Sequence, residues 1–184
     1  DVKIVVYQEL KPNLSEMIIS NSRHEDIDAI FNLYDKAIAY QHQLGNVNWV
    51  GFERSLIAQE IAEGRHFTIM EDEGLACTFV ITTSDPEIWK EANNDAAVYI
   101  HRIATNPLFR GKSYVKAIIA WAREYAAAND KDYIRMDTTS GNERLNNYYF
   151  SCGFVDKGLV YIESTENLPA HYNNRSFILF EIKL

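Results

Sequence analysis

The sequence is poor in the residues that mark disulfide-rich, linker-rich and membrane-spanning chains. It contains 2 cysteines, 8 glycines and 4 prolines among 184 residues, too few turn-forming residues for a disordered chain. The longest uninterrupted apolar run is Ala117 to Ala122, six residues, whereas a transmembrane helix needs about 20. Hydrophobic residues nevertheless make up 47% of the chain. We therefore expect a globular protein with a sizeable core and no membrane partner.

The two cysteines bear on the cellular compartment. Cys77 and Cys152 lie far apart and lack the close spacing of metal ligands, so no metal is expected. Isolated cysteines of this kind are typical of reduced thiols in a cytoplasmic protein. The first residues, Asp1 to Ile4, show neither the basic region nor the long apolar core of a secretory leader. The sequence thus predicts a cytoplasmic location.

Positive charge is scarce in the chain as a whole. Lys and Arg number 18 against 26 Asp and Glu, a net charge of −8 at pH 7. Because binding to nucleic-acid phosphates needs a basic face, this balance argues against a nucleic-acid partner. The stretch from Arg110 to Arg123 is different, with four basic residues and no acidic one. We expect a local anion site there.

The pattern of apolar residues predicts a mixed sheet, of α/β or α+β class, in a single domain over residues 17–184. Residues 1–16 are interpreted as an extension or an addition to the chain, in which Lys3 to Tyr7 are β-prone enough to add an edge strand. Ser22-x-x-Glu25 reads as a capping box that opens the first helix. Strands are predicted over 66–70, 75–82, 97–104, 133–137, 159–163 and 177–183, and helices over 22–38, 56–64, 113–129 and 142–152.

The segment from Ile100 to Val115 carries the features of a phosphate site. A predicted strand leads through Pro107 and Gly111 into the long helix. A helix start offers unpaired backbone N–H groups and the positive end of the helix dipole, and Arg110 and Lys112 add two charges. The alternative is an ordinary turn with solvated basic side chains. A Walker-type loop is disfavoured, since Asn106 stands where its first glycine is required, and a dinucleotide fingerprint fails with one glycine.

A second motif lies about thirty residues further on. Asn142, Tyr149 and Gly153-Phe154 fit the pattern Asn-x6-Tyr-x3-Gly-Phe. Together with Arg110-Gly111-Lys112-Ser113 opening a helix, this pattern strongly resembles the GNAT superfamily of N-acetyltransferases. The first family motif, Arg-x-x-Gly-x-Gly/Ala, is degenerate, because Ser113 and Val115 occupy its two small-residue positions. The resemblance extends from about Met17 to Leu184.

The resemblance implies a GNAT-like acyl-CoA N-acyltransferase fold. In it a central mixed sheet is flanked by helices and splayed between two central parallel strands, here residues 97–104 and 133–137. It further implies acetyl-coenzyme A as cosubstrate, with the pantetheine along the first strand and the pyrophosphate on the loop backbone. The residues implied in binding are Ile103, Ala104, Thr105, Arg110, Gly111, Lys112, Ser113, Tyr114, Val115, Asn142 and Tyr149.

The resemblance also implies a general acid. Tyr149 would protonate the leaving thiolate, and a phenol with a reference pKa of roughly 10 keeps its proton at neutral pH. The alternative is a core aromatic on an amphipathic helix, beside Leu145 and Tyr148. Cys152 has no His/Asp pattern that would make it a nucleophile. Direct attack by a primary amine in a ternary complex therefore fits better than an acyl-enzyme.

No motif specifies a base. An amine with a reference pKa near 10.4 is almost wholly protonated at pH 7, so a base or a water chain is useful. Strand alternation places Tyr99, His101 and Ile103 on one face. A structural, hydrogen-bonded His101 is an equal alternative to a catalytic one. The candidates are His101 and Asp137, followed by Glu71, Asp72 and His171.

The acceptor side is least specified. Trp49 lies in the loop from His42 to Phe52, which usually borders the acceptor site in this family, and is either a lid or a packing anchor. Trp89 and Trp121 are expected to serve in packing. A non-catalytic coenzyme A-binding or interaction module, and an acyltransferase with another acyl donor, remain alternative hypotheses. The amine acceptor and the oligomeric state are open, with a homodimer as one alternative.

Overall fold

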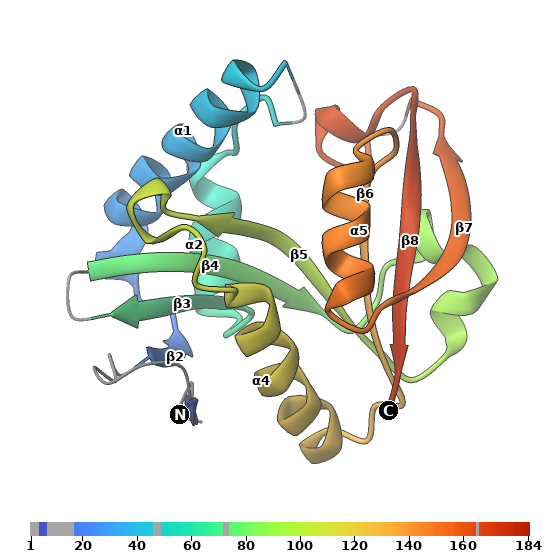
Figure 1. Cartoon of the computed structure of the whole chain (residues 1–184), viewed down its shortest axis with the longest axis horizontal. Helices are drawn as coiled ribbons and strands as arrows, with labels where there is room; N and C mark the ends of the chain where they lie inside the picture. Colours follow the sequence, from blue (N-terminus) through green and yellow to red (C-terminus); the bar gives the residue numbers. More distant parts are fainter. Residues whose placement is uncertain (1–3, 7–16, 46–48, 72–73, 165) are drawn as a thin grey trace. The chain divides into compact units, whose positions relative to one another are not determined.

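The computed structural model describes residues 4–6, 17–45, 49–71, 74–164 and 166–184 (Figure 1). Within these ranges no helix is long and apolar enough to cross a bilayer. The helices are α1 (Ile27–Gln43), α2 (Arg54–Ala62), α3 (Pro86–Trp89), α4 (Tyr114–Ala128) and α5 (Glu143–Ser151). The strands are β1 (Ile4–Val6), β2 (Met17–Asn21), β3 (His66–Glu71), β4 (Gly74–Thr82), β5 (Ala97–Thr105), β6 (Tyr133–Thr139), β7 (Val155–Ile162) and β8 (Arg175–Lys183). Short 3-10 helices are η1 (His24–Asp26), η2 (Lys90–Asn94), η3 (Pro107–Phe109) and η4 (Ala170–Tyr172).

The chain forms two compact units. The first contains residues up to Val80 and Arg102–Trp121, and the second contains Ile81–His101 and Ala122–Leu184. Hydrogen bonds order the strands of the first unit as β1-β2-β3-β4 and those of the second as β5-β6-β8-β7. The pairs β1–β2, β2–β3, β3–β4, β6–β8 and β7–β8 are antiparallel, and β5–β6 is parallel. The predicted mixed α/β class is therefore confirmed.

The first unit has helices on both faces of its strands. Phe67 of β3 stacks on Phe79 of β4 at 5.2 Å between ring centroids, and both rings contact Trp121 of α4. On the opposite face, Tyr34 of α1 and Ile57 of α2 belong to a second buried cluster. Figure 1 shows α4 in front of β3 and β4 and α2 behind them. The predicted packing role of Trp121 is confirmed.

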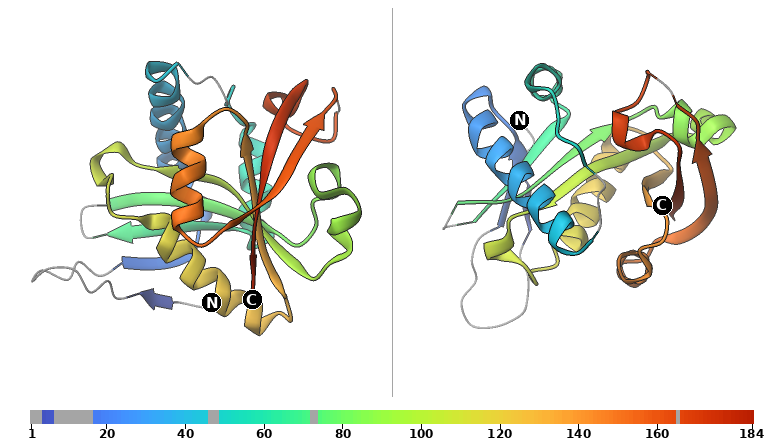
Figure 2. Two further views of the ribbon diagram at one scale, coloured as in Figure 1. Left: turned by 45° about the vertical axis from the view of Figure 1, so that its right-hand side comes forward. Right: turned by 90° about the horizontal axis from the view of Figure 1, so that it is seen from above.

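The second unit is also covered on two sides, as both views of Figure 2 show. On one side, Trp89 of α3 packs with Tyr99 of β5 and Phe177 of β8. On the other side, Phe180 of β8 contacts Tyr149 of α5 at 5.3 Å between centroids. Phe177 and Phe180 are an odd number of positions apart, so they point to opposite faces of the strand. One strand thus joins two apolar layers.

The parallel pairing of β5 with β6 is short. It covers Ala97–Tyr99 of β5 and Tyr133–Arg135 of β6. Strand β6 continues to Thr139 and stays paired with β8 as far as Thr139 and Phe177. In the part of the chain that the structure describes, β6 has no β5 partner beyond Arg135. The splay expected between these two central strands is confirmed.

The predicted elements are present, with shifts of a few residues at their ends, but the predicted capping box is wrong. The cap contact is one residue later: the backbone N–H of Arg23 donates to the Asp26 carboxylate at 2.7 Å. The Ser22 hydroxyl instead lies 2.7 Å from Nδ1 of the buried His66. Burial lowers the pKa of His66 to about 3, so the imidazole is neutral there. Helix α3 and η2 were not predicted.

The expected edge strand is confirmed for residues 4–6, which pair with Met17–Ile19 of β2. The rest of the 1–16 segment, with Lys3 and Tyr7, lies outside the described residues. The division of the chain into an extension and a domain over 17–184 stays a prediction.

A buried ion pair holds β5 in the first unit. The two terminal guanidinium nitrogens of Arg102 donate to the Glu60 carboxylate of α2, at 2.8 and 3.0 Å. The guanidinium also lies 4.4 Å from the centre of the Phe52 ring. Arg102 has a φ of +53°, the left-handed region, which costs an L-residue about 1–2 kcal/mol. The paired charges offset this cost and fix the strand at that residue.

We expect Glu60→Gln to lower the free energy of unfolding by about 3 kcal/mol, because it leaves a buried guanidinium without its counter-charge. Urea denaturation followed by circular dichroism measures the change. Glu63→Gln is the matched control, since Glu63 pairs with Arg65 at the surface. Equal midpoints for the two variants would show that the Arg102 pair does not stabilise the first unit.

Candidate functional site

The predicted anion loop belongs to the first unit and is anchored at its start. The backbone N–H of Asn106 donates to the Ala76 carbonyl at 2.8 Å, and its side-chain amide donates to the Leu75 carbonyl at 3.0 Å. The Asn106 side-chain oxygen accepts from the N–H of Leu108 at 3.2 Å and caps η3. The asparagine that argues against a Walker motif is therefore the residue that ties the loop to β4.

Two left-handed residues turn the loop into α4. Gly111 has a φ of +84° and Ser113 a φ of +56°. Glycine adopts this region without steric cost, which explains why a glycine suits the position that Ser113 occupies. Arg110, Gly111 and Lys112 are exposed, and α4 begins at Tyr114. The backbone N–H groups at this helix start are those that an anion would use.

A buried carboxylate binds two residues at the end of the loop. Glu71 of β3 is ion-paired with Lys112 and accepts a hydrogen bond from the Tyr114 hydroxyl at 2.5 Å. Burial raises the pKa of Tyr114, and the hydrogen bond and charge of Glu71 raise it further. Glu71 was a candidate base, but its two carboxylate oxygens bind Lys112 and Tyr114, the residues on either side of Ser113. Asp72, another candidate, lies outside the described residues.

The other basic residue of the loop is held by an aromatic ring. The Arg110 guanidinium lies 3.1 Å from the centre of the Tyr40 ring of α1. Since the Lys112 charge is balanced by Glu71, Arg110 carries the positive charge of the loop that no carboxylate offsets among the described residues. Val115, at the second small-residue position of the family motif, is buried.

Residues 103–105 of β5 lie close to the first-unit core. Ala104 is buried with Tyr34 and Ile57, and Ile103 is half-buried. The Thr105 hydroxyl lies 3.6 Å from Sγ of Cys77. Burial raises the pKa of the Cys77 thiol to about 12, which keeps it protonated and unreactive. Both cysteines are free.

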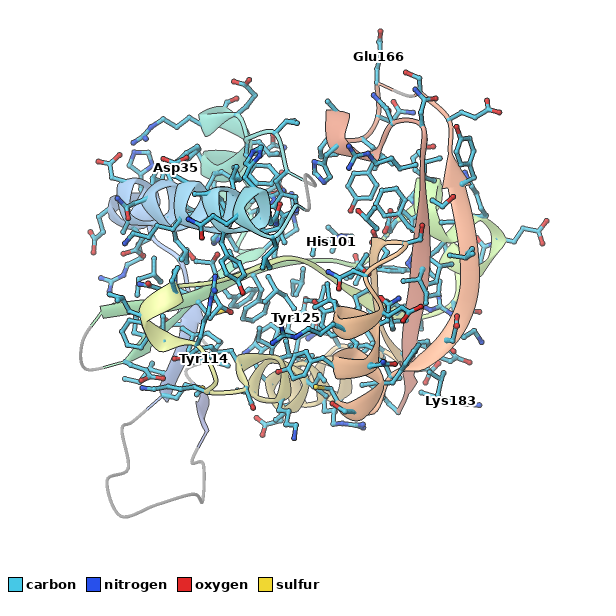
Figure 3. The ribbon with its side chains drawn as sticks, turned by 45° about the horizontal axis from the view of Figure 1, so that its top comes forward. Asp35, His101, Tyr114, Tyr125, Glu166 and Lys183 are labelled. Carbon is cyan, nitrogen blue, oxygen red and sulfur yellow. The ribbon has the colours of Figure 1, made fainter. Side chains whose placement is uncertain are left out.

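In the second unit, two of the predicted base candidates, His101 (labelled in Figure 3) and Asp137, come together with a third residue, Asp85. Nδ1 of His101 lies 4.0 Å from Oδ1 of Asp137 on β6, and Nε2 lies 3.9 Å from Oδ2 of Asp85. Nε2 is also 3.1 Å from the Thr82 hydroxyl at the end of β4. An imidazole thus lies between two carboxylates.

Both carboxylates hold their protons more tightly than usual. Burial raises the pKa of Asp137 to about 7, and the charge of Asp85 adds to the shift. Burial also raises the pKa of Asp85 to about 6. Each group therefore changes protonation near neutral pH, which is the range a general base needs.

Asp85 is the residue of this cluster that the sequence did not reveal. It precedes Pro86, the first residue of α3, and an acidic residue before a proline is a recognisable helix start. That signal predicts the helix, but it says nothing of the approach to His101.

Asn142 and Tyr149 are positioned by α5. The Asn142 side chain accepts from the Leu145 N–H at 3.1 Å and is the N-cap of the helix. Tyr149, only 7% exposed, lies among the rings of Tyr148, Phe154 and Phe180. The motif asparagine starts the helix, and the motif tyrosine lies two turns further along it.

Two remaining candidates are packed against aromatic rings. Trp49 contacts Tyr34 and Phe52 at 6.0 and 5.4 Å between centroids, and its backbone N–H donates to the Gln41 side chain at 3.1 Å. These contacts favour the packing anchor over the lid. His171 of η4 is buried, 4.7 Å from the Tyr172 ring.

Comparison with known proteins gives a consistent assignment. A family model described as acetyltransferase (GNAT) family matches residues 29–154. The uncharacterized N-acetyltransferase YesJ of Bacillus subtilis (strain 168) is 23% identical over 143 residues, 73% of this chain and 79% of that protein. A GNAT-family acetyltransferase of Listeria monocytogenes 4b F2365 is 24% identical, with a TM-score of 0.75 and 100% of each chain covered.

A more distant solved structure shares the same fold. A mutant form of SpeG spermidine N-acetyltransferase from Vibrio cholerae is 15% identical, with a TM-score of 0.62, 91% of this chain and 93% of that chain covered. The matches support the fold that the two sequence motifs implied.

We expect Ser113→Gly to raise the free energy of unfolding by up to about 1 kcal/mol, because glycine relieves the left-handed conformation at the start of α4. Ser113→Ala is the control, since alanine keeps the strain and should leave stability nearly unchanged. The urea midpoints of the parent chain and of the two variants measure these changes in stability. A glycine variant no more stable than the alanine variant would mean that the loop adopts another conformation in solution.

Proposed function

The chain belongs to the acetyltransferase (GNAT) family, and we propose that it transfers the acetyl group of acetyl-coenzyme A directly to a primary amine. Members of this family typically use acetyl-coenzyme A. The observation that carries the proposal is the complete Asn142…Tyr149…Gly153-Phe154 motif, which lies within the matched residues 29–154. Asn142 caps the start of α5, Tyr149 lies in its last turn, and Gly153-Phe154 follow the helix. The loop ahead of α4 supplies a second, independent support.

We assign the pyrophosphate to the backbone of residues 110–115. The exposed Arg110, Gly111 and Lys112 and the open start of α4 fit an anion of this size. The proposed pantetheine contacts are the backbone groups of Ile103 to Thr105, with Asn142 assisting at the thioester end. The chemistry that acetyl-coenzyme A supplies is an activated acyl group on a thiol leaving group.

Tyr149 is the proposed general acid. Its hydroxyl donates a proton to the sulfur as the carbon–sulfur bond breaks, and solvent returns a proton to the phenol. The aromatic surroundings of Tyr149 fix its ring, as a positioned acid requires. Because burial holds the Cys77 thiol protonated and no base pattern activates Cys152, a direct attack by the amine is favoured over an acyl-enzyme.

His101 is the proposed proton acceptor. The amine nitrogen loses a proton as it bonds to the acyl carbon, and the imidazole takes that proton. Asp85 and Asp137 on either side stabilise the resulting imidazolium when both carboxylates are ionised. The products are an amide and the free thiol of coenzyme A. The amine gives one proton to His101, and Tyr149 gives one proton to the sulfur.

The acceptor is proposed as a cationic amine, in keeping with the acidic balance of the chain. Spermidine, named for the Vibrio cholerae neighbour, is one member of the panel to be tested, with amino acids, peptide N-termini and lysine side chains as the others. A homodimer remains a proposal that sizing in solution tests.

Thiol release from acetyl-coenzyme A across this panel tests the function. We expect at least one amine to stimulate release, and Tyr149→Phe to lower kcat by about 100-fold, the contribution of a positioned acid. Tyr148→Phe is the matched control on the same helix. Cofactor binding without acetylation of any amine would favour the non-catalytic module, and a product of different mass would favour another acyl donor.

The rate should depend on pH with a defined sign. Because the pKa values of Asp85 and Asp137 are about 6 and 7, kcat/KM should rise as pH increases through this interval and the carboxylates ionise. His101→Gln should lower the rate and remove the rise. An unchanged profile in that variant would assign proton removal to another group.

Glu71 is proposed as a positioning residue for the loop. Glu71→Gln removes the ion pair to Lys112, and we expect KM for acetyl-coenzyme A to increase about tenfold, equivalent to about 1.4 kcal/mol, with kcat little changed. Glu124→Gln, an exposed substitution on α4, is the control. A fall in kcat with an unchanged KM would contradict the proposed role.

A further inference from the structure

The cluster in the second unit has the donor set of a metal site. Asp85, His101 and Asp137 each offer one ligand atom, and the three atoms lie within 4.8 Å of one another. Carboxylate oxygen and imidazole nitrogen are both ligands of Zn²⁺ in proteins. Three different segments supply the three residues: the turn after β4, β5 and β6.

A second observation concerns the state of Asp85. Its side chain is only 7% exposed, and Oδ2 is buried without a hydrogen-bond partner among the residues that the structure describes. A buried carboxylate oxygen left unsatisfied is costly unless a cation or a proton compensates it. The nearest group named for this oxygen is Nε2 of His101, at 3.9 Å. The oxygen is thus directed into the cluster.

The spacing suits a small cation. A triangle with sides of at most 4.8 Å contains a point no farther than about 2.8 Å from each corner. Zn²⁺ binds nitrogen and oxygen ligands at about 2.0–2.2 Å, so each ligand atom has to move inward by no more than about 0.8 Å. Side-chain rotations of this size do not require the strands to move. His101, with 20% of its side chain exposed, leaves a path from solvent.

We propose that Asp85, His101 and Asp137 form a binding site for a divalent transition metal, with Zn²⁺ as the probe. Two carboxylates and one neutral imidazole neutralise the ion, and water completes its coordination. Because the metal takes the imidazole lone pair, it also blocks the proposed proton acceptor. Inhibition of acetyl transfer rests on the proposed function, whereas metal binding does not.

Calorimetric titration of the chain with Zn²⁺, in the absence of acetyl-coenzyme A, tests the site. We expect one ion per chain, and affinity at least tenfold weaker in His101→Gln and in Asp85→Asn. The exposed His24→Gln and Asp130→Asn are the matched controls and should bind as the parent chain does. Equal affinity in all four variants, or no binding at all, would overturn the proposal.

A second measurement guards against misfolded variants. Co²⁺ bound by nitrogen and oxygen ligands gives visible absorption, and Zn²⁺ should abolish this absorption in the parent chain by displacement. His101→Gln should fold with the circular dichroism of the parent chain and give no such absorption. Retention of the spectrum in that variant would place the metal elsewhere. Because neither readout uses catalysis, failure of the metal site and failure of the acetyltransferase proposal are distinguishable.

Discussion

The buried pair of Arg102 and Glu60 is the constraint that fixes β5 in the first unit. It holds a left-handed residue in the middle of β5, where the steric cost is about 1–2 kcal/mol. Before Arg102, the strand pairs with β6 and presents His101 to its carboxylates. After Arg102, it packs Ala104 in the first-unit core and leads to the loop that Asn106 anchors. One strand therefore carries His101 of the cluster and leads to the loop ahead of α4.

The loop ahead of α4 is basic, whereas the cluster of Asp85, His101 and Asp137 is acidic. At the loop, Glu71 balances Lys112, and Arg110 and the start of α4 are left as the groups proposed to attract phosphate oxygens. In the cluster, two buried acids flank a histidine, and a proton or a cation relieves the mutual repulsion of Asp85 and Asp137. The same repulsion favours both the proposed proton transfer from the amine to His101 and the proposed metal ion.

The sequence predicts most of the fold and fewer of the local contacts, for physical reasons that particular residues illustrate. Periodicity located β5, β6 and α4, and the motif spacing around Tyr149 identified the family, because both are properties of neighbouring residues. The roles of Ser22 and Glu71 were missed, since each depends on a partner about forty positions away, His66 and Lys112 respectively. Asp85 was missed because its partner in the cluster belongs to another element. Left-handed residues other than glycine, such as Arg102, leave no local pattern to read.

The proposal of direct transfer is tested most directly by following the acetyl group itself. The chain is incubated with acetyl-coenzyme A carrying an isotopically labelled acetyl group, first alone and then with each amine of the panel, and both protein and small molecules are resolved by mass. The account predicts that the label passes to an amine and never resides on the protein. Label bound to the chain before amine is added, or label that stays on coenzyme A with every amine, would contradict it.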